Sequence, residues 1–409
     1  MIFESECMSK PSSELVLSAR ERRAVELIGR ARELIPMLDR AGERVESSRR
    51  VPDDVLDALH DASLFRLLIP RSLGGEEVEP ATYFQVLEAI AQGDASVAWC
   101  VGQASGVSIA AAYLKPEVAS AVFSDRRAVA ASGPNNPKAT AVVCDGGYRV
   151  SGDWTFASGS KHSTWLCGHS TICEPDGRPR VGPDGEPLDL LTVLFPKSSA
   201  VVTDVWDVMG LQGTASDNYS TRDLFVPADF SFTRESDKDR KEQGPLYRFN
   251  IFNLFGLGFS AVALGVASRA LDEFIKLATK KTASGKTSPL SDNNVIQSQV
   301  GLSDMRLRSS RTHVIDVYQT VYRAAERRER FDQATRVALR TATCHAIHQA
   351  REVMNFVYHA AGATAIFTSN PFERRFRDLH TLTQQGQAAF SNFESHGKIL
   401  MGLTSKDWL

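Results

Sequence analysis

The sequence is poor in cysteine and carries little net charge. Its six cysteines include no CxxC pair and no other spacing typical of a metal site or a disulfide framework, so we expect free thiols in a reducing compartment. Lys and Arg number 47 against 49 for Asp and Glu, and a net charge of -2 gives no electrostatic reason to expect a nucleic-acid partner. The composition favours a small-molecule ligand.

Long apolar runs are also missing. No run approaches the ~18 residues that a membrane span requires. The start, MIFESECMSKPSSE, has no basic segment followed by an apolar one. We therefore expect a cytoplasmic protein without a membrane partner, whose residues 1–17 are disordered.

Several common motifs are absent as well. The sequence has neither GxGxxG nor GxxxxGK[ST], and no GxSxG, so Rossmann, P-loop and α/β-hydrolase sites have no support. His345 and His348 lie about one helical turn apart, a spacing that suits two metal ligands. No clear third ligand accompanies them, so we favour a polar helix face and expect no metal.

What the sequence does contain is a change of hydrophobic period at two points. Residues 18–127 follow helical spacing, residues 128–235 alternate apolar and polar side chains between Gly- and Pro-rich turns, and residues 236–409 return to helical spacing. This pattern predicts an α+β fold with an N-terminal helical domain, a small antiparallel β domain and a C-terminal helical bundle, in which one helix covers 371–398. Continuous apolar faces suggest that the bundle extends across an oligomer interface.

Four segments resemble those of the acyl-CoA dehydrogenase superfamily and occur in its order. They are IPRSLGGEEV from Ile69, GGYRVSGDWTFASGS from Gly146, WDVMGLQGTASDNYSTRDLFVP from Trp206 and ERRFRDLHTL from Glu373. The resemblance implies that family's fold, with a C-terminal four-helix bundle, and a flavin cofactor. It agrees with the order of helices and strands inferred from periodicity.

The superfamily implies two alternative chemistries. Dehydrogenases use tightly bound FAD and a catalytic glutamate. The group D flavin-dependent monooxygenases, which include oxygenases acting on p-hydroxyphenylacetate or dibenzothiophene, take reduced flavin from a separate reductase and form a C4a-hydroperoxide. No acid lies between Asp378 and Glu394, where the base often follows the R-D pair, and Tyr247 to Asn253, the other position, has no carboxylate. Because a base contributes roughly 10² to 10⁴ in rate, dehydrogenation is disfavoured.

The segment WTFASGSKHSTW resembles the flavin-facing wall of the group D enzymes. The resemblance implies that the Ser158 hydroxyl donates to flavin N5 or to its neighbouring carbonyl, while aromatic side chains exclude water. His162 has two interpretations: it contacts the substrate or the flavin edge, or it is a turn histidine that holds the bend.

The histidines of the aromatic-hydroxylating members are only partly matched. His380 fits the first position of their late histidine pair, or it is a polar residue on a packed helix. Gln385 stands at the second position, and the helical stretch 98–111 has no histidine. The resemblance therefore gives no support to a simple phenol substrate.

The resemblance also assigns residues to the flavin and to the substrate. Basic and small residues after the first C-terminal helix are expected to meet the flavin phosphate. Arg377 would contribute from this or a neighbouring subunit, but with Arg374 and Asp378 it would equally serve helix packing. The expected flavin contacts are Ser132, Pro134, Phe156, Ser158, Lys281, Ser284, Gly362 and Arg377. The largely apolar substrate pocket is expected to include Trp99, Gln103, Phe252, Phe255 and Gln385.

The sequence thus predicts the oxygenase component of a two-component flavin-dependent monooxygenase. It would take reduced flavin, FMNH2 in preference to FADH2, from a separate NAD(P)H-dependent reductase and use O₂ to oxygenate a small aromatic or heteroaromatic molecule. We expect a homotetramer or homodimer assembled through the C-terminal helices. Two alternatives stay open: an FAD-dependent acyl-CoA dehydrogenase with an unplaced base, and a non-catalytic binding protein of the same fold.

Overall fold

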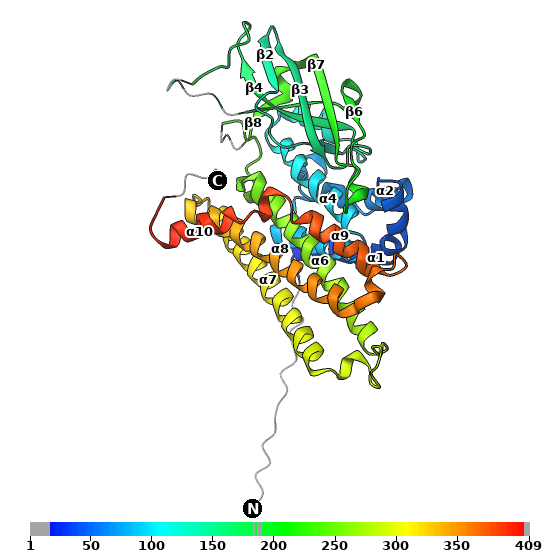
Figure 1. Cartoon of the computed structure of the whole chain (residues 1–409). Helices are drawn as coiled ribbons and strands as arrows, with labels where there is room; N and C mark the ends of the chain where they lie inside the picture. The colour runs from blue at the N-terminus through cyan, green and yellow to red at the C-terminus, as the bar shows by residue number, and fades with distance from the viewer. Residues whose placement is uncertain are drawn as a thin grey trace, which may run out of the picture.

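The computed structural model describes residues 17–404 apart from 183, 184, 186, 187, 189, 235 and 237. Helices come first along the chain, a sheet follows, and helices return to the end (Figure 1). This order confirms the predicted fold class. The disorder expected for residues 1–17 falls outside the described residues, except at Leu17.

From residue 17 onward, five α-helices precede the sheet. Ser18 and Glu21 form a capping box at the start of the first, and prolines stand in the first turns of the third and fifth. The fourth is capped by Asp94 and is buried on nearly every side. The five are α1 Ala19–Ser47, α2 Asp53–Asp61, α3 Pro80–Gly93, α4 Ala95–Ser108 and α5 Pro116–Phe123.

Among the described residues, eight strands form one sheet. It lies at the top of the molecule in Figure 1. The strand order is β6-β7-β3-β2-β4-β5-β8, and β1 pairs with β4 off this path. The strands are β1 Ala130–Ser132, β2 Thr140–Cys144, β3 Gly147–Ala157, β4 Trp165–Cys173, β5 Leu191–Pro196, β6 Val201–Thr203, β7 Asp217–Pro227 and β8 Ser231–Thr233.

The prediction of an antiparallel β domain is wrong for part of this sheet. Strand β4 runs parallel to both β1 and β2, whereas the other pairs are antiparallel. The tight turn at Gly146 fixes only the β2–β3 hairpin. The connection from Ser158 to Thr164 then carries the chain across to the other edge of β2, and local turn residues do not reveal such a crossover.

The C-terminal helices are long and pack mainly on one another. Helix α6 is buried along most of its length and contacts α3, α4, α7, α8 and α9. The helices are α6 Ile251–Ala278, α7 Asn294–Glu326, α8 Gln333–Ala361, α9 Pro371–Leu382 and α10 Ser391–Leu400.

The single helix predicted for 371–398 is wrong, because α9 and α10 are separated by a short 3₁₀ turn, Gly386–Ala388. Side chains from neighbouring helices satisfy the carbonyls of this turn. Asn392 Nδ2 donates to the Gly386 carbonyl at 3.2 Å, and His348 Nε2 lies 2.9 Å from the Ala388 carbonyl oxygen. These tertiary contacts replace the helical hydrogen bonds that the local sequence would otherwise make.

The expectation that no apolar run approaches the length of a membrane span is wrong: two helical stretches in the described part of the chain are long and apolar enough, by length and composition alone, to cross a membrane. They are Ala95–Ala112 and Ile251–Ala278, and 94% and 83% of their windows are buried inside the protein. Such burial is that of core helices, so packing accounts for their apolar composition.

Candidate active site

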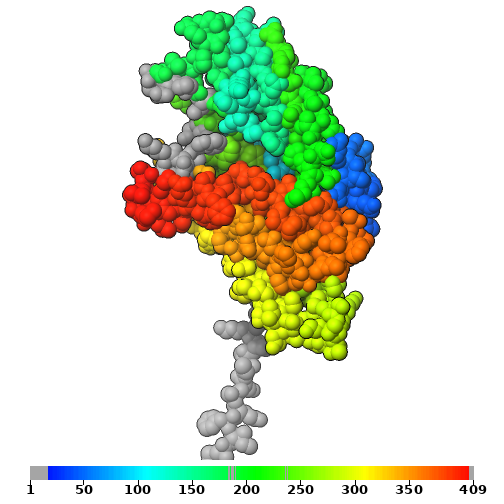
Figure 2. Space-filling view, viewed as in Figure 1, coloured from blue at the N-terminus to red at the C-terminus, as the bar shows by residue number. Residues whose placement is uncertain are grey.

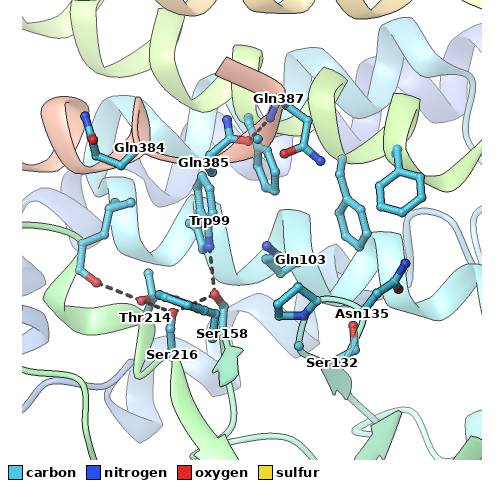
Figure 3. Close-up of a pocket in the computed structure, with 18 of the residues that line it drawn as sticks. Trp99, Gln103, Ser132, Asn135, Ser158, Thr214, Ser216, Gln384, Gln385 and Gln387 are labelled. Atoms are coloured by element: carbon cyan, nitrogen blue, oxygen red, sulfur yellow. Dashed lines mark hydrogen bonds between the residues drawn. The ribbon is translucent and has the colours of Figure 1, made fainter. Parts of the chain in front are cut away.

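A cavity of about 410 Å³ lies where the sheet meets the helices. Helices α4 and α6 and the turn between α9 and α10 form one side, and strand ends and their loops form the other (Figure 3). Trp99 of α4 stacks on Phe259 of α6 with ring centroids 4.0 Å apart, and Phe255 adds a further ring. The volume and aromatic walls are those of a small-molecule site.

The structure brings together most of the side chains that the sequence assigns to flavin or substrate. They come from α4, α6, the loop after β1, the end of β3 and the segment after α9, which are distant in the sequence. The predicted residues that line the cavity are Trp99, Gln103, Ser132, Pro134, Phe156, Ser158, Phe252, Phe255 and Gln385.

A β-bulge aims Phe156 into the cavity. The register between β3 and β7 shifts between Trp154 and Ala157, and Phe156 has a φ of 56°. An extra residue of this kind bends the strand and re-aims its side chains, often beside functional sites. Trp154 therefore packs in the core of the sheet while Phe156 faces the cavity, although both belong to one aromatic motif.

Hydroxyl groups line the sheet side of the cavity next to Phe156. Trp99 Nε1 donates to Ser158 Oγ at 2.9 Å, and Ser158 Oγ lies 2.7 Å from Ser216 Oγ. Ser216 Oγ lies 2.7 Å from Thr214 Oγ1 (Figure 3). The three hydroxyl side chains are buried, so these contacts hold them in place.

The loop that carries Thr214 and Ser216 is held by α9. Asp378 accepts the Leu211 backbone N–H at 2.6 Å, and Arg377 Nη1 donates to the Met209 carbonyl at 2.7 Å. In Figure 2 the green surface of the sheet meets the orange and red surface of the C-terminal helices. Helix α9 therefore positions this wall of the cavity.

Burial raises the pKa of Asp378 to about 7, with a further contribution from the nearby Asp94 carboxyl. Because the folded pKa exceeds the unfolded value, this group favours the folded state below about pH 4, and that contribution is lost as the pH rises to about 7. We expect Asp378→Asn, which keeps an acceptor for Leu211, to gain stability relative to the wild type between pH 4 and 7. Urea denaturation of both proteins across this range measures it, and a constant difference would contradict it.

His162 does not line the cavity. Its ring packs against Phe65, with centroids 5.8 Å apart, and its backbone N–H donates to the Gly159 carbonyl. Burial lowers the pKa of His162 to about 3, and the neighbouring His60 adds to this effect. The geometry favours the turn-histidine interpretation over a ligand contact.

His380 also lies outside the cavity. Its Nε2 lies 2.9 Å from Asn355 Oδ1 of α8, and its ring packs on Phe376. These contacts favour the interpretation of His380 as a polar residue on a packed helix.

His345 is exposed whereas His348 is buried. The described residues contain no group of three His, Cys, Asp or Glu that could hold a metal.

The residues predicted for the flavin phosphate lie elsewhere in this chain. Lys281 Nζ donates to the Ala361 carbonyl at 2.6 Å and to Thr364 Oγ1 at 2.7 Å, next to Gly362. Ser284 is exposed in the same region. Their contact with the flavin phosphate stays a prediction.

Arg377 is engaged in packing rather than in the cavity. It donates to Glu373, four residues earlier on α9, and to Glu46 of α1. The ion pair at helical spacing on α9 is thus Arg377–Glu373, in place of the Arg374–Asp378 pair that the sequence suggested.

Sequence reasoning gave no role to several residues that line the cavity. Thr214 and Ser216 stand inside the GLQGTAS segment, so that motif was a signal for them. Arg234 follows β8, donates to Asn135 Oδ1 at 2.6 Å and lies over the Phe252 ring. No local pattern marks Arg234, because only the sheet topology brings it to the cavity.

Two family models match the chain. The acyl-CoA dehydrogenase N-terminal domain matches residues 31–116, and the C-terminal domain of the same family matches residues 257–388. The chain belongs to the acyl-CoA dehydrogenase superfamily.

Similar proteins of this superfamily are named as monooxygenases. The chain is 26% identical to the oxygenase subunit HsaA of a flavin-dependent monooxygenase from Rhodococcus jostii, covering 85% of this chain and 90% of HsaA. It is 28% identical to indole-3-acetate monooxygenase from Pseudomonas putida, covering 89% and 90%. The structure of XiaF from Streptomyces sp. in complex with FADH2 and glycerol superimposes with a TM-score of 0.85 at 25% identity, covering 94% and 97%.

The cavity of this superfamily member suits a flavin ring. Aromatic side chains offer flat apolar surfaces, and hydroxyl and amide groups stand at the edges. The Gln385 amide Oε1 accepts the Gln387 N–H, while its buried Nε2 has no hydrogen-bond partner among the described residues. Because a buried unpaired donor is costly, this amide is suited to a ligand acceptor.

The described cavity wall contains no aspartate or glutamate. His169 also lines it, but burial lowers the pKa of that imidazole well below its usual value, and its Nδ1 lies 3.0 Å from Thr192 Oγ1. The wall therefore offers hydroxyls, amides and one guanidinium, but no carboxylate base.

Proposed function

We propose that the protein is the oxygenase component of a two-component flavin-dependent monooxygenase. The observation that carries the proposal is an aromatic cavity with a buried hydroxyl cluster and no carboxylate on its described wall. A dehydrogenase would need a base there to remove a proton from its substrate. The names of the similar proteins support the same reading.

Reduced flavin, when bound, supplies the two electrons with which one atom of O₂ enters the substrate and the other leaves as water. The residues of this chain bind the flavin and the substrate and shield them from water. Phe156, Trp206 and the aromatic side chains of α6 exclude water, and Gln385 Nε2 can donate to a ligand carbonyl. Ser158 holds the ligand edge at the sheet side.

The aromatic rings support an aromatic or heteroaromatic substrate. Trp99, Phe252 and Phe255 offer faces on which a flat ring can stack. The preference for reduced FMN over reduced FAD stays a prediction, because XiaF was solved with FADH2.

The proposal extends to partners and location. A separate reductase would supply the reduced flavin, since HsaA is named as an oxygenase subunit.

Exposed apolar side chains on α7, namely Val295, Leu302 and Met305, support assembly into a homodimer or homotetramer through the C-terminal helices. Free thiols at five described cysteines support a reducing, cytoplasmic location.

An anaerobic flavin titration tests this function. We expect the purified protein to bind reduced flavin at least about tenfold more tightly than oxidised flavin, because its cofactor arrives already reduced. Fluorescence and absorbance titrations with FMN and FAD in both states measure the four Kd values. Tight oxidised FAD that is bleached anaerobically by an acyl thioester would instead establish a dehydrogenase.

A further inference from the structure

A second, polar cavity of about 120 Å³ lies where α6 begins. It shares no lining residue with the 410 Å³ cavity of the candidate active site. Its described lining contains no aspartate or glutamate. Besides four aromatic residues, the lining consists of three arginines and two asparagines, namely Arg240, Arg248, Arg336, Asn250 and Asn253.

A buried amide of this lining has an unused donor. The Asn253 side chain is 3% exposed, and its Nδ2 has no hydrogen-bond partner among the described residues. The backbone of this residue is held, because its carbonyl accepts Tyr318 Oη at 2.6 Å and its N–H donates to the Asn250 carbonyl at 3.0 Å. A buried donor without an acceptor is destabilising, so this amide is suited to a ligand that brings an acceptor.

The Arg248 guanidinium is oriented toward the same space by backbone carbonyls. Its Nη2 donates to the Glu329 carbonyl at 2.9 Å and to the Arg328 carbonyl at 3.3 Å, both on the connection between α7 and α8. Its Nε is buried and has no hydrogen-bond partner in the described part of the chain. The cavity therefore holds unused donors on two elements, α6 and the turn before it.

The electrostatic environment of this cavity is positive. Arg336 stands in the first turn of α8 and Asn250 is the N-cap of α6, so the positive ends of two helix dipoles add to the three guanidiniums. Two acids on the connection between α7 and α8 are used elsewhere: Asp332 is exposed and caps α8, and Glu329 accepts from Arg327 Nε at 2.6 Å. An anion in the cavity would relieve the repulsion between these positive charges.

We propose that this cavity is a second binding site, which takes a small oxyanion of the phosphate or carboxylate class. Arg248 and Arg336 supply charge-assisted hydrogen bonds, and Asn253 Nδ2 supplies a neutral donor. One water-sized group needs about 10–15 Å³ of such volume, so 120 Å³ admits a phosphate or carboxylate group but no flavin ring. Because the two cavities share no lining residue, the anion binds while the flavin is bound.

Calorimetric titration of the full-length protein with sodium phosphate, sulfate and acetate tests this site, with chloride used to keep the ionic strength constant. We expect saturable binding of one anion per chain, and the tighter of phosphate and acetate identifies the preferred headgroup. Arg336→Gln and Asn253→Leu each remove a donor and are expected to weaken that binding about tenfold. Arg327→Gln removes an equal charge outside the lining and is the matched control with an unchanged Kd.

Three results would overturn the second site. They are the absence of saturable binding of all three anions to the wild type, equal weakening in Arg327→Gln and Arg336→Gln, and competition between FMN and the anion. The first would leave the proposed oxygenase function intact, because flavin titration tests it separately. Thermal unfolding checks that each variant is folded, and if Asn253→Leu does not fold, Arg336→Gln still decides.

Discussion

Replacing Trp154 by alanine is expected to lower the free energy of unfolding by about 3–5 kcal/mol. The indole is 1% exposed, stacks on Tyr219 with centroids 5.2 Å apart and donates to the His169 carbonyl at 3.1 Å. Added Cβ atoms at Gly152 and Gly168 would lie 2.7 and 2.6 Å from its ring, so the indole fits because both positions are glycine. Its loss would leave a large cavity in the sheet core.

Trp165→Ala is the matched control, because it removes the same side chain from a nearby strand. Trp165 is only partly buried and stacks on Phe230. We expect it to cost clearly less than Trp154→Ala, since less apolar surface is lost. Chemical denaturation followed by circular dichroism measures both, and equal losses would show that Trp154 is no more central to the sheet than Trp165.

Gly106→Ala is expected to weaken reduced-flavin binding by at least about tenfold. An added Cβ at Gly106 would overlap the Phe255 ring, which lines the cavity and packs beside Phe259. The ring must then move, and overpacking of this kind costs about 1–3 kcal/mol. Over most of its range, this cost exceeds the roughly 1 kcal/mol that alanine gains over glycine in a helix.

Gly102→Ala, one turn earlier on α4, is the control for this prediction. Its added Cβ would lie 3.3 Å from Leu87 Cδ1 and 3.7 Å from the Tyr83 hydroxyl, contacts that small side-chain shifts can accommodate. We expect nearly unchanged flavin affinity and equal or higher stability. Flavin titration and thermal unfolding of both variants test this prediction. Equal changes of flavin affinity in the two variants would refute the role given to Gly106.

The order of helices and strands could be predicted because it depends on local periodicity. The cavity wall at the end of β3 could also be predicted, since Phe156 and Ser158, which line it, stand in a motif whose position in the fold is recognisable. The parallel pairing of β4 could not be predicted, because it depends on a crossover connection between strands. The break after α9 could not be predicted either, because Asn392 of α10 supplies a hydrogen bond to the turn.

The roles of single side chains were harder to predict than the location of the site. His162 and Arg377 have the chemistry of ligand contacts, but tertiary packing turns one against Phe65 and pairs the other with Glu46. The Ser158 hydroxyl is held by the Trp99 indole and by the Ser216 hydroxyl, which lie far from it in the chain. Sequence motifs identify a polar side chain at the site but not its hydrogen-bond partners.

Oxygen-isotope labelling tests the proposed function most directly. The purified protein would be given a flavin reductase, NADH, FMN or FAD, ¹⁸O₂ and a panel of phenols, indoles and benzothiophenes, with products analysed by mass spectrometry. We predict a product with one ¹⁸O atom, formed only when reduced flavin is supplied. A product whose new oxygen is unlabelled, and therefore derives from water, or desaturation without oxygenation of acyl thioesters added to the same panel, would contradict the account.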